Sequence, residues 1–288
     1  NLVRIYYRID GVLQQKHIFP ISFHQSLSTR FKIMADIDIS NTNIPHDGRF
    51  KYQGSVGEIN LRASTFPTHL GETVVLRLLK YTDVVGDLSR HGFEKDDLER
   101  FMQNLKRPYG LVLSTGPTGS GKSTTLAALL RRISKSRSCH VVTIEDPIEF
   151  LFTDDKATIS QREVGTDTPT FKEALRNAFR QDPDVMMVGE MRDLETMSTV
   201  ITAAETGHLV FSTLHTNSAA QTVDRIIGVF PAGQQEGIRN ILGESLRAVI
   251  AQQLLPKVDG GRVAAVEIVF ASGAISNLIR RGKVAQIG

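Results

Sequence analysis

The sequence predicts an α/β protein built from two units, a small α+β unit followed by a larger unit with a mostly parallel sheet. The chain has 288 residues, and about 150 residues for each domain suggests two domains. In the second part, short apolar runs alternate with helical segments, which is typical of buried parallel strands. Residues 81–92 lose this periodicity and gain Asp, Gly and Ser, as linkers do. We therefore place the first unit at residues 1–82, the linker at 83–95 and the second unit at 96–288.

The first unit begins with a strand pattern in which apolar residues alternate with polar ones from Val3 to Ile9. Because the first residue is Asn1 and the strand starts at once, we expect the sequence to begin inside a domain. A turn is expected at residues 10–11 and a helix at 26–35. Further short strands, separated by glycines, should continue as far as Leu79.

The second unit opens with a helical pattern from Asp96 to Leu105, which Pro108 and Gly110 end. Near the other end of the chain, apolar residues from Ile238 to Ile250 predict a long amphipathic helix. A strand at residues 262–269 and a short last helix should follow. The apolar runs expected to form the sheet are 111–114, 141–144, 185–188 and 209–211.

Composition excludes several classes of protein. Hydrophobic residues make up 41% of the chain and charged residues 23%, as in an ordinary globular protein. The 34 basic and 31 acidic residues are interspersed, so no basic stripe points to nucleic acid. The single Cys139 excludes an intramolecular disulfide and a cysteine zinc cluster, and it is compatible with the cytoplasm. No apolar stretch approaches the roughly 18 residues that cross a bilayer, so membrane attachment would need partners.

The strongest motif is the run GPTGSGKS at residues 116–123, between a predicted strand and a predicted helix. Its glycines let backbone N–H groups face phosphates, and the helix N-terminus adds positive charge. Lys122 should reach the β- and γ-phosphates, and the Ser123 hydroxyl should bind Mg²⁺. The motif predicts a nucleoside triphosphate site. The residues expected to contact the nucleotide are Gly116, Pro117, Thr118, Gly119, Ser120, Gly121, Lys122, Ser123 and Thr124.

Acidic residues follow two of the predicted strands. Glu190 ends one strand, and since Gly189 stands where many such proteins have a metal-binding Asp, Glu190 should polarise water or reach the metal through water. Glu145 and Asp146 end the preceding strand, and parallel strands present these ends to one crevice. We therefore expect Asp146 to assist Ser123 in holding Mg²⁺. Whether Glu145 or Glu190 activates the water stays open.

A histidine follows a third predicted strand. His215 lies just beyond residues 209–211, where a group that senses the γ-phosphate would sit. His208 precedes the same strand, and a structural role is expected for it.

The segments GPTGSGKSTT, TIEDPIEF, DPDVMMVGEMRD and AAETGHLVFSTLHTNSA occur in this order and resemble the Walker A, aspartate, Walker B and histidine boxes of the secretion and type IV pilus ATPase superfamily. The resemblance implies hydrolysis of ATP with Mg²⁺ by a homohexamer. Each subunit would join a PAS-like domain to a RecA-like domain. The motor would work in the cytoplasm, peripheral to the inner membrane, with a platform protein of a pilus or secretion system. In this family the first domain supplies arginines to a neighbouring subunit, and Arg62 and Arg77 match those positions.

The direction of work is left open by the sequence. The segment GEINLRASTFPTHLGETVVLRLL resembles secretion and pilus-extension ATPases, whereas HTNSAAQTVDRIIGVFP and SLRAVIAQQLLPKVDGGRVAAVEI resemble the retraction branch. The tail AISNLIRR also resembles the retraction branch, but it departs from that branch's motif AIRNLIRE at Ser276 and Arg281, which weakens this part of the resemblance. The tetracysteine zinc motif of many secretion ATPases is absent from the sequence, which favours a pilus motor.

Two other functions compete with this interpretation. A RecA-like DNA translocase or helicase would share the phosphate loop, the acidic strand end and arginines acting between subunits, but it should carry clustered basic and aromatic residues. A small-molecule kinase would need an acceptor pocket and a lid, and no segment after Glu190 has that pattern.

Overall fold

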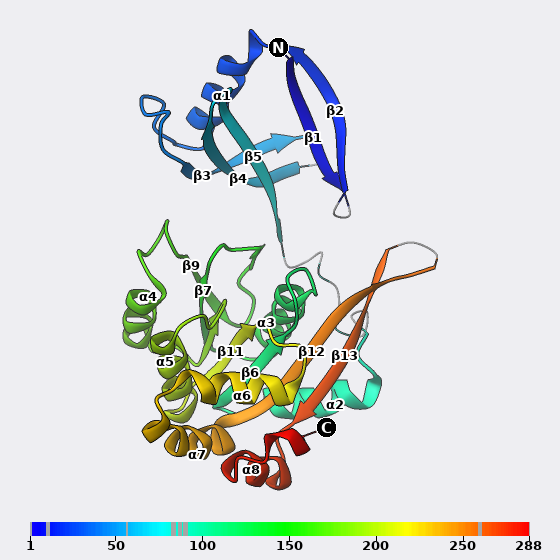
Figure 1. Cartoon of the computed structure of the whole chain (residues 1–288), viewed down its shortest axis with the longest axis vertical. Helices are drawn as coiled ribbons and strands as arrows, with labels where there is room; N and C mark the ends of the chain where they lie inside the picture. The colour runs from blue at the N-terminus through cyan, green and yellow to red at the C-terminus, as the bar shows by residue number, and fades with distance from the viewer. Residues whose placement is uncertain are drawn as a thin grey trace. The chain divides into compact units, whose positions relative to one another are not determined.

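The computed structural model describes residues 2–9, 12–55, 57–81, 85, 88, 92–258 and 261–287 (Figure 1). It divides into two compact units, residues 1–80 and 81–288. The predicted turn at residues 10–11 and most of the predicted linker lie outside the described residues. Of the helices in these ranges, none is both long and apolar enough to cross a bilayer.

The first unit is a small α+β structure. A hairpin of β1 and β2 precedes one helix, and then β3, β4 and β5 lie side by side as antiparallel neighbours. Gly48 lets β3 approach the end of the helix, because a Cβ there would lie 2.2 Å from the Ala35 carbonyl oxygen. The elements are β1 (Leu2–Ile9), β2 (Val12–Pro20), α1 (Phe23–Met34), β3 (His46–Gly54), β4 (Gly57–Thr68) and β5 (Gly71–Tyr81).

The two faces of β4 differ in character. Ala63 is fully buried and packs with Ala35 and Ile37 in the core of this unit. Arg62 faces the opposite side, because successive residues of a strand point to opposite faces. It lies directly opposite Arg49 of β3 and Arg77 of β5, so three arginines form a row across the strands. We call Arg49, Arg62 and Arg77 the arginine row.

The second unit is built on a seven-stranded sheet in the order β13-β12-β6-β11-β10-β7-β9. All neighbouring strands are parallel except the edge pair of β12 and β13. This confirms the predicted fold class, with a mostly parallel sheet in the larger unit. The strands are β6 (Gly110–Thr115), β7 (His140–Glu145), β9 (Thr158–Glu163), β10 (Val185–Val188), β11 (Leu209–Leu214), β12 (Leu246–Pro256) and β13 (Arg262–Phe270), and a short β8 (Phe150–Leu151) follows β7.

Helices cover both faces of this sheet, which explains why its central strands are apolar throughout. One face packs against α2 (Lys95–Leu105) and α3 (Lys122–Ser136). The other face packs against α4 (Phe171–Ala178), α5 (Leu194–Glu205), α6 (Ala219–Val229), α7 (Gln235–Ser245) and α8 (Gly273–Arg280). Short 3₁₀ turns lie at η3 (Phe179–Gln181), η4 (Ala232–Gln234) and η5 (Val284–Gln286).

The predicted long helix from Ile238 to Ile250 is wrong in its second half. Helix α7 ends at Ser245, and β12 begins at Leu246. Residues Leu246 to Gln252 are buried, because β12 lies between β6 and β13 and is covered on both faces. A continuous apolar run fits either a buried strand or a buried helix, and here pairing with β6 decides the outcome. The prediction also missed β9, the edge strand beside β7.

Candidate active site

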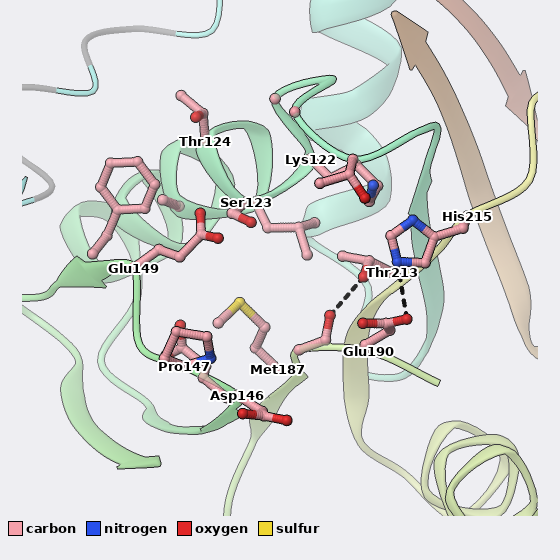
Figure 2. Close-up of a pocket in the computed structure, with 18 of the residues that line it drawn as sticks. Lys122, Ser123, Thr124, Asp146, Pro147, Glu149, Met187, Glu190, Thr213 and His215 are labelled. Carbon is pink, nitrogen blue, oxygen red and sulfur yellow. Dashed lines mark hydrogen bonds and ion pairs between the residues drawn. The ribbon is translucent and has the colours of Figure 1, made fainter. Parts of the chain in front are cut away.

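A pocket of about 460 Å³ lies where the parallel strands of the second unit end (Figure 2). Strands β6, β7, β10 and β11 all run in the same direction, so the residues that follow them meet at one edge of the sheet. This edge brings together most of the predicted site residues. Those that line the pocket are Thr118, Gly119, Gly121, Lys122, Ser123, Thr124, Glu145, Asp146, Glu190 and His215.

The loop between β6 and α3 has the geometry of a phosphate cradle. Gly116 and Gly121 have φ angles of 140° and 92°, which L-residues with side chains rarely adopt. Gly121 caps α3, so the helix begins at Lys122 and its free N–H groups point out of the helix end. The Lys122 ammonium group is buried and donates to the carbonyl oxygens of Gly116 at 2.7 Å and Pro117 at 3.0 Å. Burial lowers the pKa of Lys122.

Two of the pocket residues suit magnesium by the chemistry of their donor atoms. Mg²⁺ prefers oxygen ligands, and in such sites one or two protein groups share the ion with phosphate oxygens and water. Ser123 offers a hydroxyl at the start of α3, and Asp146 offers a carboxylate just after β7. The Asp146 carboxylate lies 3.5 Å from the guanidinium group of Arg192.

Glu145 is the last residue of β7 and is 7% exposed. One of its oxygens, Oε1, accepts hydrogen bonds from the Thr143 hydroxyl at 2.7 Å and from the Gln161 amide at 3.1 Å. Burial raises the pKa of Glu145 to about 7, although the two hydrogen bonds favour the charged form. A carboxyl group that ionises near neutral pH suits a proton acceptor.

The Glu190 carboxylate has two close partners, Arg192 and His215, and Figure 2 shows its contact with His215. His215 Nε2 lies 2.9 Å from one carboxylate oxygen, and Arg192 Nε lies 2.9 Å from the other. The ends of β10 and β11 are joined because the Thr213 hydroxyl donates to the Gly189 carbonyl oxygen at 2.6 Å. The arrangement therefore couples His215 to the carboxylate that follows β10. The His208 ring instead packs edge-on against the Phe179 ring, and 5.4 Å separates the two ring centroids.

Several residues of the site were not predicted from the sequence. Arg192 carries a charge two residues beyond Glu190, and its proximity to that acid was the available signal. Gln161 belongs to β9, which the prediction missed, and Leu254 and Arg262 line the pocket from the β12–β13 hairpin. Gln161, Leu254 and Arg262 reach the site through the pairing of their strands, which local sequence patterns do not specify.

Arg62 and Arg77 belong to the first unit. Arg62 donates to the Asp47 carboxylate at 3.3 Å, and its side chain is 20% exposed. Arg77, directly opposite it on β5, is exposed. Their predicted role in a neighbouring subunit stays a prediction.

Comparison with known proteins identifies the family. The model of the family described as "Type II/IV secretion system protein" matches residues 1–274. The type IV pilus retractation ATPase PilT of Pseudomonas aeruginosa is 45% identical over 280 residues, which are 97% of this chain and 79% of that protein. The type II secretion system protein E of Xanthomonas campestris is 40% identical over 258 residues, or 89% of this chain and 44% of that protein.

A solved structure supports the same assignment. The crystal structure of the pilus retraction motor PilT with bound ADP superposes with a TM-score of 0.84 and 41% identity. The match covers 98% of this chain and 80% of that one. These relatives confirm the predicted superfamily and the predicted class of enzyme, an ATPase. With a family model that spans almost the whole sequence, the chain belongs to the type II/IV secretion system protein family.

Proposed function

We propose that this chain hydrolyses ATP to drive a type IV pilus or a type II secretion system. The observation that carries the proposal is the meeting of the phosphate loop, Glu145 and the Glu190–His215 pair in one pocket. The relatives named above are motors or secretion proteins, and the comparisons give the alternative of a DNA translocase no support. Similarity to the pilus ATPase extends over more of the chain, which favours a pilus motor.

In this proposal the loop and the start of α3 hold the triphosphate. Lys122 would exchange its two carbonyl partners for phosphate oxygens, and the N–H groups of the loop would surround the phosphates. Ser123 and Asp146 would hold Mg²⁺, which when bound neutralises charge that develops on the phosphates. The ADP bound to PilT in its crystal structure supports nucleotide binding by this chain.

Two carboxylates are available to act on the attacking water. Glu190 is held between His215 and Arg192, and this fixed position suits a group that orients the water. Glu145 is buried and its pKa lies near 7, which suits a group that accepts a proton. We propose that Glu190 orients the attacking water and that Glu145 assists Glu190 through the metal or a second water.

We further propose that the active form is a homohexamer. It would be peripheral to the cytoplasmic face of the inner membrane and bound to a platform protein of the pilus or secretion system. Arg62 and Arg77 would act on the nucleotide of a neighbouring subunit. Their position opposite one another on β4 and β5 supports this role, because two guanidinium groups side by side suit a polyanion.

The test separates binding from chemistry. Lys122→Ala should abolish ATP binding, because it removes a phosphate contact that exists before the reaction. Glu190→Gln should bind ATP normally and stop hydrolysis, and Glu145→Gln should lower turnover strongly with little change in affinity. Binding by calorimetry and phosphate release would be measured on each variant. Glu205→Gln, at the exposed end of α5, makes the same chemical change away from the pocket. Equal loss of binding in the Lys122 and Glu190 variants would refute these roles.

A further inference from the structure

Strand β12 brings a buried glutamine to the back of the phosphate loop. It runs parallel to β6, with Ile250 opposite Ser114 and Ala251 opposite Thr115. Gln252 therefore lies level with Gly116, where β6 ends and the loop begins. Its side chain is buried, since the residue is 5% exposed. Gln252 lies two residues beyond Ile250, where the helix predicted from the sequence ends, and the structure places it in β12.

Both polar atoms of the Gln252 side-chain amide form hydrogen bonds. Its Nε2 donates to the Ser120 carbonyl oxygen at 2.7 Å, and the Ser114 hydroxyl donates to its Oε1 at 3.4 Å. Close packing accompanies these bonds. A Cβ on Gly116 would lie 2.2 Å from the Gln252 carbonyl oxygen, and one on Gly121 would lie 3.0 Å from Nε2. The loop thus rests on Gln252 at both of its ends.

The bond to Ser120 also determines where the next N–H points. The C=O of Ser120 and the N–H of Gly121 belong to one planar trans peptide, so they point in opposite directions. Gln252 holds the carbonyl at the back of the loop. The Gly121 N–H must therefore face away from Gln252, and Gly121 lines the pocket. Backbone N–H groups turned inward are what a loop of this kind offers to phosphate.

We propose that Gln252 is a positioning residue that holds the Ser120–Gly121 peptide with its N–H toward the phosphates of the bound nucleotide. This rests on nucleotide binding at the loop, as proposed above. Glutamate at this position keeps the shape and can still accept from Ser114. An ionised glutamate cannot donate a hydrogen bond to Ser120, so the Ser120 carbonyl loses its partner. The Ser120–Gly121 peptide plane is then free to rotate.

The experiment compares ADP binding by calorimetry in Gln252→Glu, Gln252→Met and Gln253→Glu. Both Gln252 variants should bind ADP about tenfold or more weakly, because each leaves a buried carbonyl unsatisfied. The methionine variant introduces no charge, so it still tests the proposal if the glutamate variant folds poorly. Gln253 points to the opposite face of the same strand and is exposed, so Gln253→Glu should bind within twofold of the parent.

A second measurement distinguishes positioning from simple loss of structure. If Gln252 positions the loop, KM for ATP should rise with the ADP dissociation constant while kcat at saturation changes little. A merely structural role would lower the number of binding sites and the unfolding temperature, and would leave the affinity of the folded molecules unchanged.

A folded Gln252 variant that binds ADP as tightly as the parent would overturn the proposal. Lys122→Ala shows whether the error lies in the role of Gln252 or in the assignment of the loop as the nucleotide site. If Lys122→Ala also binds ADP normally, the loop is not the nucleotide site. If Lys122→Ala loses binding and the Gln252 variants keep it, only the positioning role of Gln252 is wrong.

Discussion

At the scale of single residues, the carboxyl group of Glu145 is subject to opposing effects. Burial disfavours its charged form, while hydrogen bonds from Thr143 and Gln161 favour that form, and burial is the larger effect. The pKa of about 7 compares with an ordinary value of 4.5. Between these values the folded chain binds more protons than the unfolded chain, so stability should fall as the pH rises from about 4.5 to 7.

Glu145→Gln should remove this pH dependence. Between pH 4.5 and pH 8, the parent should lose more free energy of unfolding than the variant, by an amount on the order of 3 kcal/mol. Urea unfolding at both pH values, without nucleotide or Mg²⁺, gives the comparison, and Glu205→Gln controls for removal of an exposed carboxylate. Identical pH dependence in Glu145→Gln and the parent would show that the Glu145 carboxyl ionises normally.

At the scale of elements, α5 depends on the residue that caps it. Asp193 accepts a hydrogen bond from the Thr196 backbone N–H at 2.8 Å and another from the Thr196 hydroxyl at 2.9 Å. The cap fixes where the chain turns from the Glu190 region into the helix. A capping side chain satisfies an N–H group that the helix itself leaves without a partner.

Asp193→Ala should destabilise the protein by about 1 kcal/mol, the usual value for loss of an N-terminal cap. Asp193→Asn should be nearly neutral, because asparagine accepts the same hydrogen bond. Denaturant unfolding measures both. If the asparagine variant is as unstable as the alanine variant, the negative charge of Asp193 matters and the cap does not.

The elements also show what could be predicted from the sequence. The phosphate loop, Glu145, Glu190 and His215 each follow a short apolar strand, so their position at one edge of a parallel sheet could be derived from local patterns. Gln161 and Gln252 could not, because β9 and β12 are defined by the strands beside them. The run that ends in Gln252 is apolar enough for a helix or a strand, and only its place beside β6 makes it a strand.

At the scale of the whole molecule, the proposed arginines lie in a different unit from the phosphate loop. Arg62 and Arg77 belong to residues 1–80, while the pocket belongs to residues 81–288. An arginine supplied by a neighbouring subunit stabilises charge in the transition state and accelerates hydrolysis by about 10³ to 10⁵. Turnover for each subunit should therefore rise with protein concentration as rings assemble.

Mixed rings test this assignment. Lys122→Ala subunits keep both arginines, and Arg62→Ala, Arg77→Ala subunits keep an intact loop, so a mixture should regain part of the ATPase activity that each parent lacks. Mixing Lys122→Ala with Glu190→Gln is the control, since both changes damage the receiving pocket and should not complement. If mixed rings form and stay as inactive as either parent, the two arginines do not act between subunits.

The arginine row has a consequence for how the first unit responds to dissolved anions. Arg49, Arg62 and Arg77 face one another across three strands, and like charges placed directly opposite repel. Asp47 offsets part of this repulsion through its bond to Arg62. At 0.1 M salt the screening length is roughly 10 Å, so charges directly opposite one another on neighbouring strands are only partly screened. The ion pairs Arg62–Asp47 and Lys51–Glu58 also join β3 to β4, and salt weakens them as well. A multivalent anion seated on the row would instead neutralise several guanidinium groups at once, so it should stabilise the first unit more than a univalent salt does at the same ionic strength.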